Sequence, residues 1–134
     1  MILVDTHVLI WTVNGDKRLG PRALDMLQNE DDRRASAMLF CELAMLGSKK
    51  RVVFAPSLEL WIEHARTKLN LAEVPVTSAI AKDAGTLSSD IHGDLCDRIM
   101  IATARAMACP LITADREILA FATKGHLEAI DARR

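Results

Sequence analysis

The sequence predicts an α/β fold in which a mostly parallel sheet is covered by helices on both faces. The first observation is residues 99–108 (IMIATARAMA), which are almost wholly apolar or small and predict a deeply buried helix. Pro110 breaks that helix because proline lacks an amide proton, and residues 111–113 (LIT) follow as a short strand. The second observation is the apolar run of residues 1–4 (MILV), as expected of a central parallel strand. Strands that alternate with helices in this way are typical of α/β sheets.

The other segments continue this alternation. The proline at position 21 suits the first turn of a helix, and residues 58–68 are amphipathic, with Leu60, Trp61 and Ala65 expected to face the core. The chain of 134 residues is long enough for one domain, residues 1–134, with its own core. We predict helices at residues 6–13, 21–29, 37–47, 58–68, 78–88 and from 116, and further strands at 33–36, 74–76 and 127–130.

The composition narrows the classes of function. The formal net charge is −1, so the chain lacks the positive excess that is typical of domains that bind nucleic acid by charge alone. Tyrosine is absent and other aromatic residues are scarce, which argues against a platform for stacking bases. A nucleic-acid substrate is still compatible with this composition, because acids that hold a divalent metal ion supply the positive charge that phosphate needs.

The cysteines and the hydropathy predict an intracellular protein. Cys41, Cys96 and Cys109 are odd in number and lack C-x-x-C spacing, which disfavours a disulfide framework or a zinc site. Their apolar contexts predict buried, reduced thiols. No apolar run approaches the length of a membrane span, and the first residues do not have the pattern of a signal peptide. We therefore expect a cytoplasmic protein that does not associate with membranes.

Several acidic residues stand where strands end and helices begin, and each has a structural as well as a functional interpretation. Asp5, Asp94 and Asp115 are all candidate N-caps, whose carboxylates accept from free helix amides. Glu42 lies in the middle of an apolar helix, where an unpaired ionised carboxylate is costly to bury. It therefore either lies along a solvated edge or serves a site, and we favour the site.

Taken together, these acids predict a metal centre. If the strands that precede Asp5 and Asp115 are neighbours, both acids meet Asp97 at one edge of the sheet, and Glu42 can approach from its helix. Four carboxylates in one place raise each other's pKa, so such a cluster is best explained by a hard divalent cation such as Mg²⁺ or Mn²⁺. The chemistry that follows is phosphodiester hydrolysis. Thr113, near a strand end, is a candidate for orienting a water or a ligand.

Four blocks of the chain match one family in order and spacing: ILVDTHVLIW, the glutamate within SAMLFCELAM, HGDLCDRIMIATARA and LITAD. The chain resembles the PIN-domain ribonucleases over about residues 1–130, and most closely the VapC-like toxins of bacterial and archaeal toxin–antitoxin pairs. It departs from the family pattern at Leu95, where proline is common, and at Cys41, where this branch often has an aromatic residue. Neither position is an acid of the site, so the departures concern the subfamily and the substrate.

The resemblance implies a PIN-like three-layer sandwich and a four-carboxylate metal site made by Asp5, Glu42, Asp97 and Asp115. The hypothesis is a Mg²⁺- or Mn²⁺-dependent endoribonuclease that acts as a toxin, with Asp5 and Asp97 as the direct metal ligands. Glu42 and Asp115 act through waters or bind a second ion. The resemblance also implies a homodimer that a small cognate antitoxin inhibits. Asp94 falls on the family's frequent preceding acid, which we assign to helix capping, with indirect support of the metal site or a ligand role left open.

Basic residues beside the acids have two interpretations. Arg98 and Arg116 each follow an acid of the site, where they either hold RNA phosphates or balance the carboxylates. His7 is expected to make a structural hydrogen bond at a helix N-terminus rather than to act as a base or ligand.

Two other classes of function remain as alternatives. A catalytically silent PIN module that only binds proteins would be marked by loss of acids, and all four are present. A phosphoryl-transfer domain with Asp5 as acceptor would need an Asp-x-Asp motif, whereas the chain has Asp5-Thr6-His7.

Overall fold

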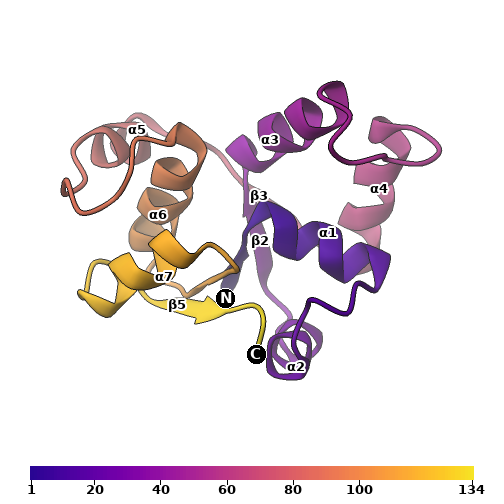
Figure 1. Cartoon of the computed structure of the whole chain (residues 1–134), viewed down its shortest axis with the longest axis horizontal. Coiled ribbons are helices and arrows are strands. Elements are labelled where there is room, and N and C mark those ends of the chain that lie inside the picture. The colour runs from indigo at the N-terminus through magenta and orange to yellow at the C-terminus, as the bar shows by residue number, and fades with distance from the viewer.

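The computed structural model describes residues 1–134 (Figure 1). Its five strands form one parallel sheet in the order β3-β2-β1-β4-β5. The sheet is built around β1, whose residues are all buried, with β2 on one side and β4 on the other. The predicted α/β class and mostly parallel sheet are therefore confirmed. The strands are β1 (Ile2–Val4), β2 (Arg33–Ser36), β3 (Ala72–Val74), β4 (Leu111–Thr113) and β5 (Ala129–Asp131).

Seven helices cover both faces of this sheet. Helices α5 and α6 pack together on one side, and α1 and α4 lie on the other, as Figure 1 shows. A large apolar core joins the sheet to α1, α3 and α6, and a smaller one lies between α5 and α6. None of these helices is long and apolar enough to cross a bilayer. The helices are α1 (Thr6–Asn14), α2 (Pro21–Asn29), α3 (Ala37–Ser48), α4 (Leu58–Leu69), α5 (Ser78–Gly85), α6 (Leu95–Met107) and α7 (Arg116–Thr123).

Every predicted element is present, and three of them have an end that differs from the prediction by two or more residues. The strand expected at 74–76 is Ala72–Val74, since Pro75 has no amide proton to continue the pairing with β2. The helix expected at 78–88 ends at Gly85. The last strand is Ala129–Asp131, parallel to β4 at the edge of the sheet.

The burial of some side chains also differs from the prediction. Leu60 was expected in the core, but it is 52% exposed, whereas Trp61 and Ala65 are buried as predicted. Of the three cysteines only Cys109 is buried; Cys41 is exposed and Cys96 is half-buried. The prediction of three buried thiols is therefore wrong, because an apolar sequence context does not decide which face of a helix a residue occupies.

The C-terminal residues are held against the start of α2. The Gly20 amide donates to the Ala132 carbonyl at 2.8 Å, and the Arg22 amide donates to the Arg134 carbonyl at 2.7 Å. A Cβ at Gly20 would overlap the backbone of Arg133 and Arg134, so glycine permits this close approach. The last residues of the chain therefore have a fixed place in the fold.

Candidate functional site

A cavity of about 500 Å³ opens at the carboxyl edge of the sheet, where β1 and β4 lie side by side. We call it the acidic cavity. The structure brings together in its wall all four acids that the sequence singled out. The cavity is lined by Asp5, His7, Trp11, Glu42, Asp94, Asp97, Ala114, Asp115, Arg116 and Arg133.

Asp5 is the most firmly held of these acids. It caps α1 by accepting from the Thr6 amide at 2.8 Å, and its other oxygen accepts from the Thr113 hydroxyl at 2.5 Å. The same hydroxyl accepts from the Asp115 amide at 3.0 Å, so Thr113 links the two strand ends. Asp5 is only 7% exposed, and this burial raises its pKa above the usual range. Thr113 thus orients an acid of the cavity, whereas the sequence analysis proposed it for orienting a water or a ligand.

Asp97 is the acid whose ionisation the fold opposes most clearly. Asp94 caps α6 through a hydrogen bond from the Asp97 amide at 3.0 Å, which leaves the Asp97 carboxylate free to face the cavity. Burial, followed by the negative charges of Asp115 and Asp5, raises the pKa of Asp97 to about 8. A carboxylate in this state gains strongly from a nearby cation.

Glu42 reaches the cavity from α3. The Thr6 hydroxyl donates a hydrogen bond to its carboxylate, which ties the middle of α3 to the first turn of α1. Burial raises the pKa of Glu42, and the nearby charge of Asp5 raises it further. The structure thus places Glu42 in the site and not along a solvated edge.

Asp115 is both a helix cap and a member of the cavity wall. One of its oxygens accepts from the Glu117 amide at 2.9 Å and from the Ile118 amide at 3.0 Å, at the start of α7. The other oxygen makes no hydrogen bond to the protein. The capping interpretation and the site interpretation are therefore compatible at this residue.

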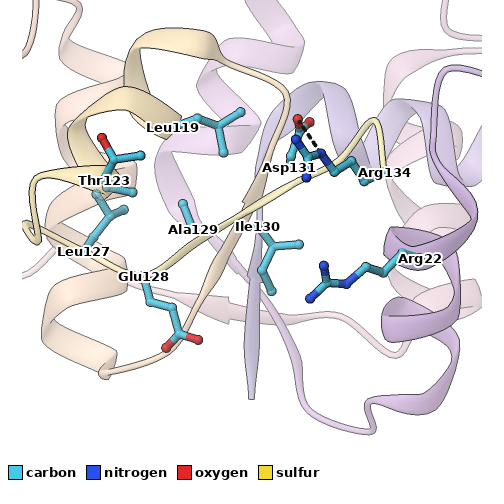
Figure 2. Close-up of a pocket in the computed structure, with 10 residues that line it drawn as sticks. Arg22, Leu119, Thr123, Leu127, Glu128, Ala129, Ile130, Asp131 and Arg134 are labelled. Atoms are coloured by element: carbon cyan, nitrogen blue, oxygen red, sulfur yellow. Dashed lines mark ion pairs between the residues drawn. The ribbon is translucent and has the colours of Figure 1, made fainter.

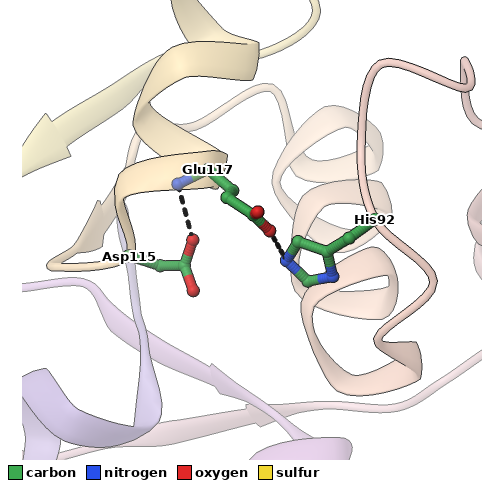
Figure 3. Close-up of side chains that lie close together, drawn as sticks. All are labelled: His92, Asp115 and Glu117. Atoms are coloured by element: carbon green, nitrogen blue, oxygen red, sulfur yellow. Dashed lines mark hydrogen bonds and ion pairs between the residues drawn. The ribbon is translucent and has the colours of Figure 1, made fainter.

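His92 is a residue of the site that the sequence reasoning missed. Its Nε2 lies 2.7 Å from a Glu117 oxygen (Figure 3). The same nitrogen lies 3.1 Å from an Asp97 oxygen. The Nδ1 of His92 accepts from the Asp94 amide at 3.0 Å, so the proton of the neutral ring is on Nε2, the nitrogen that lies beside the two acids. The only signal in the sequence was a histidine two positions before a capping aspartate.

This protonation state bears on where a metal ion can bind. Single ligand atoms of His92, Asp115 and Glu117 lie within 4.8 Å of one another, as candidate ligands would (Figure 3). A metal ion needs the lone pair of a ring nitrogen, whereas Nε2 here carries a proton and Nδ1 already accepts a hydrogen bond. We therefore interpret His92 as a hydrogen-bond donor that orients Asp97 and Glu117.

The basic residues near the acids differ from the prediction. Arg98 was expected either to hold RNA phosphates or to balance the carboxylates, but its guanidinium donates to the carbonyls of four residues in and after α5 and does not line the acidic cavity. Those four acceptors are Ala84, Leu87, Ile91 and His92. Arg116 is exposed at the cavity rim and forms no ion pair.

His7 also differs from its prediction. Its imidazole makes no hydrogen bond and instead packs edge-on against Trp11, with ring centroids 6.5 Å apart. Side-chain packing against the next turn of α1 replaces the expected structural hydrogen bond.

The donor set of the acidic cavity suits a hard divalent cation. Its acceptors are carboxylate oxygens from Asp5, Glu42, Asp97 and Asp115, which are the ligand type that Mg²⁺ and Mn²⁺ prefer. In three of these acids burial and mutual repulsion oppose ionisation, and a bound cation would offset that cost. The residues present therefore fit such an ion.

Comparisons with known proteins agree with this fold and site. The model of the PIN domain family matches residues 2–124. The chain is 31% identical over 121 residues to Ribonuclease VapC22 of Mycobacterium tuberculosis, a match that covers 87% of this chain and 88% of that protein. The chain therefore belongs to the PIN-domain family, and within it to the VapC-like proteins.

Solved structures show the same fold at lower sequence identity. A toxin–antitoxin complex from Klebsiella pneumoniae contains a chain with a TM-score of 0.66 at 21% identity, over 98% of both chains. VapBC2 from Rickettsia felis, bound to a DNA fragment from its promoter, matches with a TM-score of 0.66 at 17% identity, over 97% of this chain and 98% of that one. The predicted PIN-like sandwich is thus confirmed.

Proposed function

We propose that this protein is a Mg²⁺- or Mn²⁺-dependent endoribonuclease that acts as the toxin of a toxin–antitoxin pair in the cytoplasm. The observation that carries the proposal is the meeting of Asp5, Glu42, Asp97 and Asp115 in one cavity, with no basic side chain paired to them except His92. The 31% identity to a protein named as a ribonuclease supports RNA as the substrate.

The residues of the cavity have distinct roles in this proposal. Asp5, fixed by Thr113, and Asp97, oriented by His92, hold the metal ion directly. Glu42 and Asp115 complete the site through waters or a second ion. A bound divalent cation supplies a more acidic water and positive charge at the scissile phosphodiester. Arg116, exposed at the rim, is a candidate for holding an RNA phosphate.

The proposed partners follow from the VapC-like relatives. A cognate antitoxin is supported by the toxin–antitoxin complex from Klebsiella pneumoniae and by VapBC2 from Rickettsia felis, whose chains share this fold. The family resemblance further supports a homodimer. A silent PIN module that only binds proteins is less well supported, because all four acids are retained.

The proposal is tested by incubating the purified protein with end-labelled tRNA and ribosomal RNA, with and without Mg²⁺ or Mn²⁺. Asp97→Asn removes a proposed ligand and is expected to reduce cleavage at least about a hundredfold. Glu128→Gln, an equivalent neutralisation at an exposed acid outside the cavity, is expected to leave cleavage unchanged.

Each result has a definite meaning. Cleavage that needs metal and disappears in Asp97→Asn but not in Glu128→Gln supports the nuclease. Equal cleavage by all three proteins indicates a contaminant and contradicts it. No cleavage of any RNA by antitoxin-free protein favours the silent binding module.

A further inference from the structure

Arg133 is a positively charged side chain in the wall of the acidic cavity. It lies outside the four sequence blocks that match the family, and it forms no ion pair with the acids of the cavity. Its guanidinium lines the cavity and donates to the carbonyl of Ala114, the residue directly before Asp115. Its backbone amide donates to Asp131 at 2.9 Å. The side chain therefore reaches from the last turn of the chain back to the junction between β4 and α7.

The partners of Arg133 separate two possible roles. A residue that balances the acids would form an ion pair with one of them, yet Arg133 pairs with no carboxylate although five line the same cavity. One of its five N–H groups donates to the Ala114 carbonyl, the other four make no hydrogen bond to the protein, and the residue is exposed. An anchored guanidinium with free donors suits an anionic ligand that enters from solvent.

The position of Arg133 is fixed although its side chain is exposed. The residue before it, Ala132, is fully buried and its carbonyl accepts from Gly20, while the carbonyl of Arg134 accepts from Arg22. Hydrogen bonds on both sides thus hold the backbone of Arg133 in place. Little conformational freedom is lost when such a residue contacts a ligand.

We propose that Arg133 binds the RNA phosphate next to the scissile one, on the Asp115 side of the acidic cavity. This inference rests on the proposed nuclease function and assigns part of its substrate site to the last residues of the chain. A metal ion at the acids would attract the scissile phosphate, and Arg133 would hold the neighbouring phosphate through charge-assisted hydrogen bonds.

Arg134 offers a matched control in the next position. It has the same charge, but its side chain lies in another cavity between α7, β5 and α2, where it faces Asp131 at 3.9 Å (Figure 2). Substitution of Arg134 removes one positive charge from the same tail without touching the acidic cavity. We call the cavity around Arg134 the second cavity.

The test compares Arg133→Gln with Arg134→Gln. Glutamine removes the charge of Arg133 and keeps a side-chain N–H donor. For Arg133→Gln we expect KM for a cleaved RNA to rise roughly tenfold with kcat and the Mg²⁺ half-saturation unchanged. The slope of log RNA affinity against log salt concentration should also become less steep, by the amount expected for about one phosphate contact. Arg134→Gln should match the unmodified protein.

The contacted phosphate is identified with RNAs that carry one neutral methylphosphonate linkage at successive positions beside the cleaved bond. At the contacted position, the neutral linkage should weaken binding by the unmodified protein about tenfold and leave Arg133→Gln unaffected. Equal losses for both proteins at every position would contradict the proposal, as would equal effects of Arg133→Gln and Arg134→Gln. A fall in kcat with a shifted Mg²⁺ half-saturation would instead assign Arg133 to the metal site.

A separate measurement distinguishes failure of this contact from failure of the nuclease. Binding of a short labelled RNA is measured by anisotropy with Ca²⁺, a hard cation that takes oxygen ligands. If the unmodified protein cleaves RNA but RNA binding does not depend on Arg133, the proposed phosphate contact of Arg133 is wrong and the proposed nuclease function is supported. If it binds RNA through Arg133 but never cleaves, the contact stands and the nuclease is wrong.

Discussion

The acidic cavity and the second cavity both border α7 and are similar in size, about 500 and 550 Å³, but their charges are balanced differently. In the second cavity Asp131 faces Arg134 and accepts a backbone hydrogen bond. In the acidic cavity burial and repulsion raise the pKa of three acids, and no lysine or arginine pairs with them. The two cavities therefore cannot be told apart by volume. They differ in whether their acidic side chains are paired with a basic side chain.

The same contrast separates the basic residues. Arg98 makes four hydrogen bonds from its guanidinium to backbone carbonyls, so its charge serves the fold. Arg116 and Arg133 lie at the rim of the acidic cavity without an acidic partner. A basic side chain that makes several hydrogen bonds to the protein should affect stability when it is substituted. A basic side chain that lacks such contacts should affect ligand binding instead. The first of the three predictions below tests this division, and the other two test the unbalanced acids and their contact with His92.

The largest effect on folding is expected for Arg98→Met. The change removes four hydrogen bonds and leaves part-buried carbonyls without partners, which should lower the free energy of unfolding by about 2–3 kcal/mol. Arg116→Met is the control at an exposed position and should change stability by no more than about 0.5 kcal/mol. Urea denaturation followed by circular dichroism measures both. Equal stability of the two variants would show that the carbonyl contacts of Arg98 contribute nothing.

The second prediction concerns the pH dependence of stability without metal. The pKa of Asp97 is about 8 in the folded protein, against an ordinary 3.8. Between these values the folded state binds more protons than the unfolded state, so stability must fall as pH rises through this range. After allowance for solvent screening, the loss from pH 5 to pH 8 should be roughly 2 kcal/mol.

Thermal unfolding at several pH values in the presence of a chelator measures this fall of stability with pH. Asp97→Asn should remove most of it and make the metal-free protein more stable at pH 8, while Glu128→Gln should keep it. Added Mg²⁺ should restore stability to the unmodified protein at pH 8 but much less to Asp97→Asn. A stability that rises between pH 5 and pH 8 would contradict the assignment.

The smallest effect is expected at His92, which contacts the acids but is not proposed to hold the metal. His92→Val removes the donor to Asp97 and Glu117, and should raise the Mg²⁺ half-saturation for RNA cleavage about tenfold. Saturating Mg²⁺ should recover most of kcat, and His92→Gln, which keeps a donor, should recover part of the affinity. If valine and glutamine behave alike, the hydrogen bond is not what orients Asp97.

Local patterns predicted the fold and the acids well, for physical reasons. Asp5 and Asp115 each follow an apolar run of strand type, and the ends of neighbouring parallel strands must share one edge. Glu42 was recognisable because an acid within an apolar helix needs a partner. These inferences depend on the polarity and spacing of residues close in the sequence.

Contacts between segments that lie far apart in the sequence could not be predicted from these local patterns. Arg98 was expected to contact either RNA or the carboxylates because it follows Asp97, but its contacts are with carbonyls of α5 and of the segment after it. Arg133 enters the cavity only because the tail docks beside Gly20, which no local pattern indicates. His92 acquires its role from Glu117, twenty-five positions later in the printed sequence.

The central claim is that the acidic cavity keeps its charge unbalanced in order to hold a divalent cation. The most direct test is calorimetric titration of the metal-free protein with Mn²⁺ near pH 7, in two buffers of different ionisation enthalpy. We predict binding accompanied by proton release, because Asp97 must lose its proton, and loss of both signals in Asp97→Asn but not in Glu128→Gln. Equal binding by Asp97→Asn and the unmodified protein, or no binding by either, would contradict the claim.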